Sequence, residues 1–147
     1  MQKSFAVTAI IAVLAQQVAA DKCYGLALSS GDQNAIYQAG AIKGLIGAGE
    51  EVGYQAISGV AGGALNAAIL ANYAVGQEEA AADRMKTFWE NSTNDKLWKS
   101  WLGREAEGLM FKGGLWNDAP ALDWLKTEMA DIKPTQRWID VGLTNVL

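Results

Sequence analysis

Histidine is absent from this chain of 147 residues, and cysteine occurs only once, at Cys23. Without imidazole, Ser-His-Asp and Cys-His catalysis within the chain are excluded, as is every zinc or iron site built on histidine. A single cysteine also excludes an internal disulfide. Because no histidine is there to activate the thiol, Cys23 is expected to be a buried structural residue rather than a reactive one.

Charged residues are also few, at 19% of the chain, and the two signs are interspersed. There are 12 Lys and Arg against 16 Asp and Glu, a formal net charge of −4, so no basic surface for nucleic acid is expected. Half of the residues are hydrophobic, which is too apolar for a disordered segment. The composition therefore predicts one compact globular domain without a nucleic-acid partner.

The first twenty residues have the pattern of a secretory signal peptide. Lys3 provides a positive start, residues 5–14 are an apolar run, and Val18-Ala19-Ala20 offers small residues at a cleavage site. An uncleaved membrane anchor is the alternative, but residues 5–14 are about half of the ~20 residues needed to span a bilayer. We expect cleavage after Ala20.

Removal of residues 1–20 would leave a domain over residues 21–147 in the secretory pathway, in an extracellular or luminal location. In that compartment the triplet Asn91-Ser92-Thr93 is a glycosylation acceptor, so Asn91 is expected to carry a glycan. In the cytosol the same triplet would be a chance occurrence and not a glycosylation site.

Hydrophobic periodicity predicts alternating strands and helices in the first half of the domain. Short apolar runs over residues 23–28 and 54–57 predict buried strands. Apolar residues recur at three- and four-residue steps over residues 35–48, and residues 64–75 are apolar on most sides, which predicts two helices, the second one buried. This order predicts a parallel βαβα unit with helices covering both faces of the sheet.

After Gly76 the pattern predicts covering helices and one more strand. A helix over residues 77–91 would be amphipathic, with Glu78 outward and Phe88 inward. The further predicted elements are a Trp-rich short helix over residues 94–102, an irregular stretch over 104–114, a helix from Pro120 through Met129 and a strand over 137–147. A chain that stops inside an apolar strand favours an incomplete C-terminus over a true end at Leu147.

The glycine-bracketed turn between the second strand and the buried helix is the strongest candidate for chemistry. It reads Gly59-Val60-Ala61-Gly62-Gly63, with glycines at the first and fifth positions of a strand-to-helix turn. Such a turn lifts its third side chain above the sheet at a helix N-terminus, where N–H groups stabilise a developing oxyanion. The third residue is Ala61, whose methyl group cannot attack a carbonyl.

The order of these motifs resembles that of one family. The segments CYGLALSSGDQNAIYQAGAIKGLI and YQAISGVAGGALNAAILA are similar to the opening of a patatin-like phospholipase domain, and GGLWNDAPALDWLK and RWIDVGLTNVL are similar to later segments of it. The resemblance implies a three-layer α/β fold, hydrolysis of lipid acyl esters by a Ser-Asp dyad without histidine, and no metal or organic cofactor. In the family a GGGx(R/K)G loop after the first strand forms the oxyanion hole, and GxSxG carries the serine.

Three departures from the family pattern concern the active site. The oxyanion loop reads Ser30-Gly31-Asp32-Gln33-Asn34-Ala35, which keeps one glycine of four and lacks the basic residue. The serine position is Ala61, although Gly62 still follows it as the oxyanion donor of the elbow. The family's DG(G/A) triplet, which supplies the aspartate, does not occur in the sequence.

These departures predict a catalytically inactive domain derived from a serine lipid acyl hydrolase. The alternative is a non-catalytic module that binds a lipid, a fatty acyl ligand or a partner protein, and a third hypothesis is an enzyme that uses unconventional residues. Six tryptophans are expected mostly as core or half-buried covering residues, with Trp98 and Trp101 on one short helix as the best candidates for contact with a membrane surface.

Overall fold

The structure is a computed structural model that describes residues 23–49, 53–112, 114–134 and 136–142, without the side chains of Asp32 and Gln33. The predicted signal peptide, with its cleavage site after Ala20, lies outside the described residues, and so do residues 143–147 of the predicted last strand. Within the described part of the chain, each helix falls short of the length and apolar character needed to cross a bilayer.

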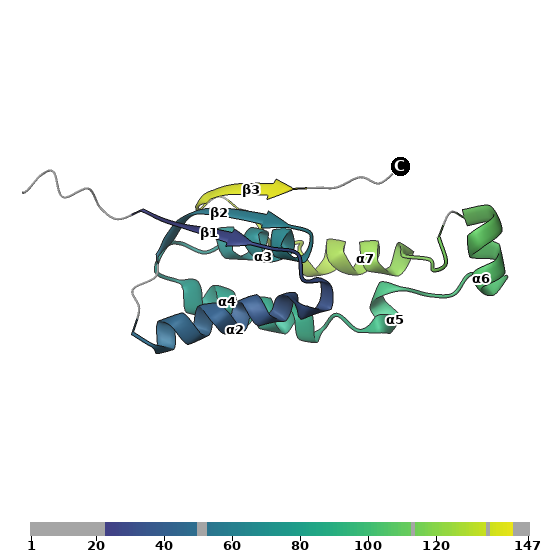
Figure 1. Ribbon diagram of the computed structural model, residues 1–147, viewed down its shortest axis with the longest axis horizontal. Coiled ribbons are helices and arrows are strands. Elements are labelled where there is room, and N and C mark those ends of the chain that lie inside the picture. Colours follow the sequence, from purple (N-terminus) through teal and green to yellow (C-terminus); the bar gives the residue numbers. More distant parts are fainter. Residues whose placement is uncertain (1–22, 50–52, 113, 135, 143–147) are drawn as a thin grey trace, which may run out of the picture.

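Three parallel strands alternate with helices (Figure 1). In chain order the elements are β1 (Tyr24–Leu28), the 3-10 turn η1 (Asp32–Ala35), α2 (Ile36–Gly47), β2 (Tyr54–Val60), α3 (Gly62–Ala71), α4 (Glu78–Glu90), α5 (Asn94–Leu97), α6 (Arg104–Glu107), the π-helical turn η2 (Gly108–Lys112), α7 (Ala119–Glu128) and β3 (Trp138–Gly142). Strand β2 lies between β1 and β3 and pairs in parallel with both. The predicted α/β class and parallel sheet are confirmed.

Most predicted elements are present, with shifts at their ends. Strand β2 runs to Val60, beyond the predicted strand, and α3 begins at Gly62, inside the predicted turn. Helix α7 has Pro120 in its first turn, as predicted. The prediction of a Trp-rich helix is wrong beyond Leu97, where α5 ends, and the stretch predicted as irregular forms α6 and η2.

The core lies between one face of the sheet and the helices α2, α3 and α4, which Figure 1 shows on the same side of the sheet. Helix α3 is buried on nearly every side, as its apolar sequence predicts, and its Ala67, Ile69 and Leu70 have no exposed surface. Helix α4 covers α3 with an apolar face that includes the fully buried Met85 and Phe88. Each large apolar side chain buried in this way contributes about 1.5–3 kcal/mol to folding.

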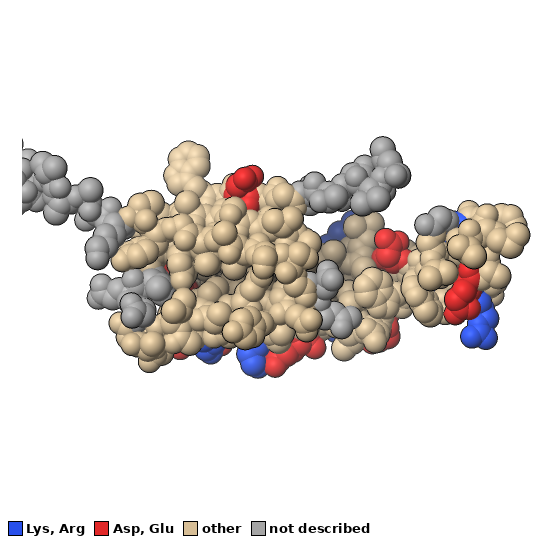
Figure 2. Space-filling model, in the orientation of Figure 1, with Lys and Arg blue, Asp and Glu red and all other residues tan. Residues whose placement is uncertain are grey.

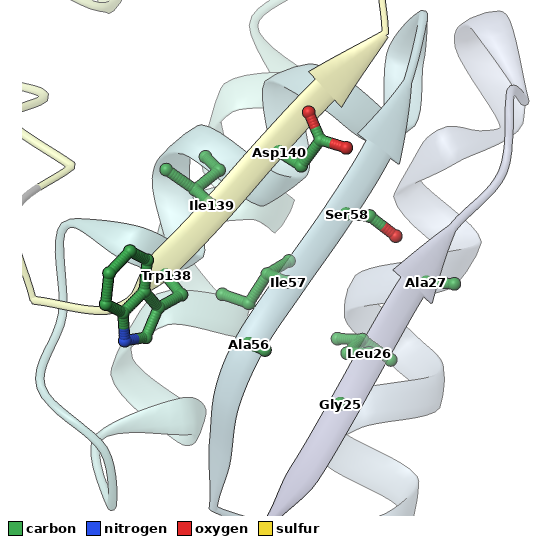
Figure 3. Close-up of a pocket in the computed structure, with 9 residues that line it drawn as sticks. All are labelled: Gly25, Leu26, Ala27, Ala56, Ile57, Ser58, Trp138, Ile139 and Asp140. Carbon is green, nitrogen blue, oxygen red and sulfur yellow. The ribbon is translucent and has the colours of Figure 1, made fainter.

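The opposite face of the sheet is open within the described residues. Burial alternates along β2, so that Ile57 faces the core while Ala56 and Ser58 are exposed. Parallel pairing places Trp138 and Asp140 of β3 beside Ala56 and Ser58 (Figure 3). The expectation of helices on both faces is therefore met on one face only, because the described helices that pack on the sheet lie on the Ile57 side.

A buried ion pair ties the start of β3 to the rest of the fold. The Arg137 guanidinium donates to Glu78 at 2.7 Å, and the two side chains are 0% and 2% exposed. Its other bonds reach the carbonyl oxygens of Tyr54, Tyr73 and Ala74 at 2.8, 2.9 and 2.7 Å. The prediction that Glu78 faces outward is wrong, because α4 begins at this residue and its carboxylate turns inward to the buried guanidinium.

Cys23 precedes the first strand rather than lying in it. Strand β1 begins at Tyr24, and Cys23 is an exposed free thiol. The expectation of a buried structural cysteine is therefore wrong, because the residue lies outside the sheet that would have covered it.

Candidate functional site

The turn between β2 and α3 has the geometry of a nucleophile elbow. Val60 ends the strand, Gly62 begins the helix, and Ala61 between them has φ 51° and ψ −121°. A positive φ is unusual for a residue with a Cβ and stores about 1–3 kcal/mol of strain, which the surrounding structure must hold in place. Ala61 is exposed at the apex of the turn. A methyl group therefore stands where a hydrolase of this type presents its nucleophile.

Close packing explains two glycines of the elbow. A Cβ at Gly63 would lie 2.3 Å from the carbonyl oxygen of Leu28 and 2.5 Å from that of Ser29. A Cβ at Gly59 would lie 2.3 Å from the carbonyl oxygen of Gly63. These approaches leave no room for a side chain, and they hold the start of α3 against the end of β1, where the candidate oxyanion loop begins.

The segment 30–35 folds as a 3-10 turn that leads directly into α2. The Asn34 N–H donates to the Gly31 carbonyl oxygen at 2.7 Å and closes the turn. Gly31 has φ −159°, an extended conformation that any residue adopts, and Ala35 is buried while Ser30 and Asn34 are exposed. Because the first N–H groups of a helix have no acceptor within it, the starts of η1 and α3 are where this site offers backbone donors to a ligand.

A buried side-chain amide connects the elbow helix α3 to the segment 30–35. Asn66 of α3 is fully buried, and its Nδ2 donates to the Ala35 carbonyl oxygen at 2.9 Å and to Gln38 Oε1 at 2.7 Å. Its Oδ1 accepts a 2.7 Å hydrogen bond from the Trp89 indole. Gln38 in turn donates to the Ser29 carbonyl oxygen at 2.7 Å. One side chain therefore fixes the loop, α2 and Trp89 relative to the elbow helix.

A cavity of about 570 Å³ lies between the two motifs. Its lining residues are Gly31, Asn34, Gly62, Leu65, Trp89, Leu97 and Trp98. Leucine and indole side chains thus stand beside the starts of two helical turns. Apolar walls with a few polar groups, in a volume of roughly 300–1,000 Å³, are typical of sites for small ligands.

Leu65, Trp89 and Leu97 line this cavity, and the sequence analysis did not identify them as candidate site residues. Two signals in the sequence could have found Leu65 and Asn66, the residue that fixes Trp89. Leu65 follows Ala61 by four residues on a helix, so it lies one turn further along the same face. Asn66 is a polar residue in a helix predicted to be buried on most sides, and a buried amide requires hydrogen-bond partners. Trp98 was a candidate for membrane contact on a predicted helix, but it follows the end of α5 and lines the cavity.

The cavity offers no attacking atom at the elbow. Ala61 has no hydroxyl or thiol, and the sequence contains no histidine to act as a base. Among the described residues, no group of three or more His, Cys, Asp or Glu side chains is placed to hold a metal ion. The described lining of the cavity combines apolar side chains with the starts of two helical turns and contains no serine, threonine or cysteine.

A serine and an aspartate do lie side by side on the open face of the sheet. Ser58 of β2 pairs in register with Asp140 of β3, in a hollow of about 460 Å³ (Figure 3). Both residues lie within strands and not at the strand-to-helix turn, so this pair is separate from the elbow.

A second cavity, of about 610 Å³, shares Trp98 with the first. Its other lining residues are Asn94, Asp95, Lys99, Ser100 and Trp116. A hydrogen bond from the Thr93 side chain holds the pKa of Asp95 below its usual value, so this carboxylate is ionised at neutral pH. The second cavity is therefore charged along part of its wall and aromatic along the rest.

Asn91, the expected glycan acceptor, is half-buried at the end of α4. Its backbone carbonyl oxygen accepts a 3.0 Å hydrogen bond from Lys96. Glycosylation of Asn91 stays a prediction.

A strand-to-helix elbow beside a loop that follows the first strand of a parallel sheet defines the class of serine-type α/β hydrolase folds. Within this class, the family model for patatin-like phospholipase matches residues 26–146, which is most of the chain. The chain belongs to the patatin-like phospholipase family. Comparisons with curated proteins and with solved structures give no significant match.

Proposed function

We propose that this chain is a non-catalytic member of the patatin-like phospholipase family that binds the acyl chain of a lipid or fatty acid. The observation that carries the proposal is the cavity of about 570 Å³ beside an elbow whose apex residue is Ala61. The ligand is held without being cleaved, because a methyl group supplies neither an attacking oxygen nor a proton to remove.

The lining of the cavity supports a ligand with one polar end and an apolar chain. Gly62 lies at the N-terminus of α3, where backbone N–H groups and the helix dipole favour a carboxylate or a carbonyl oxygen. Leu65, Leu97 and the indole of Trp89 offer apolar contact to the chain. Because Asn66 already fixes Trp89 by a 2.7 Å hydrogen bond, less entropy is lost on binding.

The turn after β1 also supports the absence of catalysis. The segment that aligns with the family's oxyanion loop is a closed turn that keeps one of its four glycines. Loss of a single oxyanion donor alone costs about 3 kcal/mol in transition-state stabilisation.

Titration of the purified chain with a fluorescent fatty acid, cis-parinaric acid, tests the binding. Saturable binding is expected, and Leu65→Trp, which fills the cavity, should weaken it about tenfold or more. Trp98→Ala should also weaken binding, with little effect on folding because Trp98 is 44% exposed. Leu45→Trp, at an exposed position of α2 outside the cavity lining, is the matched control and should bind like the parent. Equal binding by all four proteins would contradict the proposal.

Hydrolysis of nitrophenyl esters tests the absence of catalysis. The parent and Ala61→Ser are both expected to match a denatured control, because no base is available to activate a new hydroxyl. Activity is expected only when Ala61→Ser is combined with a repaired oxyanion loop and a DGG-containing C-terminal extension. The loop repair is Ser30→Gly, Asp32→Gly and Asn34→Arg. All three changes are needed because the nucleophile, the oxyanion loop and the aspartate act as a unit. Labelling of the parent by a fluorophosphonate within residues 59–63 would overturn this part of the proposal.

A further inference from the structure

The second cavity is built on a short antiparallel pairing between the segment after α5 and the segment before α7. Lys99 and Asn117 exchange two backbone hydrogen bonds, at 3.0 and 2.9 Å. Side chains alternate between the two faces of such a pairing, so Trp98, Ser100 and Trp116 share one face. These three residues line the cavity, whereas the side chains of Lys99 and Asn117 extend from the opposite face. The pairing thus places two indole rings on the same side.

The two indole rings are open to a ligand. Trp98 is 44% exposed and Trp116 is 51% exposed. The aromatic contacts among the described residues join Phe88 to Trp89 and to Trp124, so the faces of Trp98 and Trp116 are not covered by another ring there. The face of an indole carries partial negative charge and attracts a cation within about 6 Å of the ring centre more strongly than other aromatic rings do.

Asp95 adds a formal negative charge to the same cavity. Its carboxylate accepts a hydrogen bond from the Thr93 side chain, which lowers its pKa and keeps it ionised at neutral pH. Figure 2 shows acidic side chains beside basic ones along the edge formed by α2 and α4, where Lys43 pairs with Asp83 and Lys86 with Glu90. Asp95, by contrast, forms no ion pair within 4.0 Å with another described residue. Its charge is therefore available to a cationic ligand.

The two lysines nearest to Asp95 in the sequence do not fill this role. Lys96 contributes to the lowered pKa of Asp95, but its Nζ donates to the Asn91 carbonyl oxygen at 3.0 Å, at the end of α4. Lys99 extends from the face of the pairing opposite the indole rings. The wall that combines Asp95 with the two rings is therefore suited to positive charge.

The chemistry of this wall favours a quaternary ammonium group over other cations. Such a group has no N–H to satisfy, and aromatic faces are its typical binding partners in proteins. A primary ammonium is strongly hydrated and needs acceptors for three N–H donors. Among the described residues, no group of three or more His, Cys, Asp or Glu could hold a metal ion. The volume of about 610 Å³ is within the range of sites for small ligands.

We propose that the second cavity binds a small ligand through a quaternary ammonium group, with Trp98 and Trp116 against its methyl groups and Asp95 as its counter-charge. The site differs from the cavity beside the elbow, because Asp95 and Trp116 line only the second cavity. The proposal therefore stands independently of acyl binding.

A nuclear magnetic resonance titration of the full chain with choline, at constant ionic strength, tests the site. Saturable shifts of indole N–H signals are expected, with a dissociation constant in the millimolar range because so small a ligand makes few contacts. The neutral analogue of choline, in which a carbon atom replaces the nitrogen, has the same shape without the charge. It should bind about tenfold more weakly, since it is not attracted to the carboxylate or to the ring faces.

Substitutions separate the contribution of charge from that of the rings. Asp95→Asn should weaken choline binding about fivefold and leave binding of the neutral analogue unchanged, which also shows that the variant is folded. Trp116→Ala should weaken binding of both ligands, and Trp116→Phe should weaken choline binding less. Asp123→Asn and Trp138→Ala are the matched controls, because they remove an exposed carboxylate and an 83% exposed indole outside the cavity. Both should bind choline like the parent.

Titration with glycerophosphocholine distinguishes a free ion from the headgroup of a choline lipid. Weaker binding than choline would assign the free ion, and binding at least as tight would assign the headgroup. The proposal is overturned if choline gives no saturable shift, if its neutral analogue binds equally well, or if Asp95→Asn and Asp123→Asn bind choline equally. Asp95→Asn and Trp116→Ala should bind cis-parinaric acid like the parent, so failure of fatty-acid binding and failure of choline binding are separate results.

Discussion

The elbow and the turn after β1 line the same cavity, but only the elbow is held by close backbone packing. Gly63 lies so near the end of β1 that a Cβ there would be 2.3 Å from the Leu28 carbonyl oxygen. A Cβ at Gly31 would find its nearest neighbour, the Ala35 nitrogen, at 3.1 Å. The difference indicates why the elbow keeps the glycine pattern of its family while the turn keeps one glycine of four: a core contact preserves backbone geometry whether or not catalysis continues.

The energetics of Ala61 lead to the same conclusion. A residue with a Cβ at φ 51° carries strain of about 1–3 kcal/mol, and the strained turn exposes a methyl group that does no chemistry. The strain persists because α3, which begins at Gly62, is buried on nearly every side and cannot move to relieve it. The geometry of the elbow is therefore a requirement of packing.

Among single substitutions in the elbow and in the turn after β1, Gly63→Ala is expected to change the free energy of unfolding most. Its Cβ would overlap two carbonyl oxygens, so α3 would have to move away from β1, at a cost of about 3 kcal/mol or more in the free energy of unfolding. Gly44→Ala is the control: it lies in α2 with open space around its Cβ and should gain about 0.5–1 kcal/mol. Urea denaturation of the three proteins measures both effects. Equal stability of the two variants would mean that the elbow is not held as described.

Asn66→Ala is expected to cost about 2–3 kcal/mol, because it leaves the Ala35 carbonyl and the Trp89 indole without their buried partner. The same variant should weaken fatty-acid binding, since Trp89 would no longer be fixed in the cavity wall. A double-mutant cycle with Trp89→Phe measures how much of the loss belongs to this pair. Strictly additive losses would show that Asn66 does not position Trp89.

Ala61→Gly is expected to stabilise the protein by about 0.5 kcal/mol. Glycine removes the strain of the positive φ, and the greater freedom of the unfolded chain offsets part of that gain. Ala61→Val should destabilise it, because a β-branched residue is least compatible with this conformation. Thermal unfolding of both variants checks the two signs. A stabilising effect of Ala61→Val would contradict the strained geometry.

The parts of the fold that the sequence predicts well are those set by local rules. Glycine spacing identifies the turn at 59–63, and uniform apolarity identifies α3 as buried, because both signals act over a few residues. Strands β1 and β2, which precede α3 in the chain, were also predictable from short apolar runs. Even so, the strand-end at Val60 was missed, since β2 continues into the glycine turn.

Features that depend on contacts between distant residues could not be predicted from local patterns. The amphipathic pattern predicts that Glu78 faces outward. Its burial is explained by the ion pair with Arg137, which lies 59 positions away in the sequence. The cavity likewise joins Gly31 to Trp98, which lies 67 positions later in the sequence. Hydrophobic periodicity carries no information about contacts between distant residues. The glycine motifs were therefore found from the sequence, whereas Leu65, Trp89 and Leu97 of the cavity lining were not.

Gly31→Ala gives the smallest expected effect and the sharpest test of the comparison. Its φ of −159° suits any residue, and the nearest contacts of a new Cβ, 3.1 Å to the Ala35 nitrogen and 3.2 Å to its Cα, require a shift of only a few tenths of an ångström. Stability should therefore change by less than about 0.5 kcal/mol, as for an ordinary surface substitution. Urea denaturation beside Gly63→Ala measures the difference directly. A loss at Gly31 as large as the loss at Gly63 would mean that the turn is constrained as tightly as the elbow, and the sequence divergence of the turn would then need a cause other than loose packing.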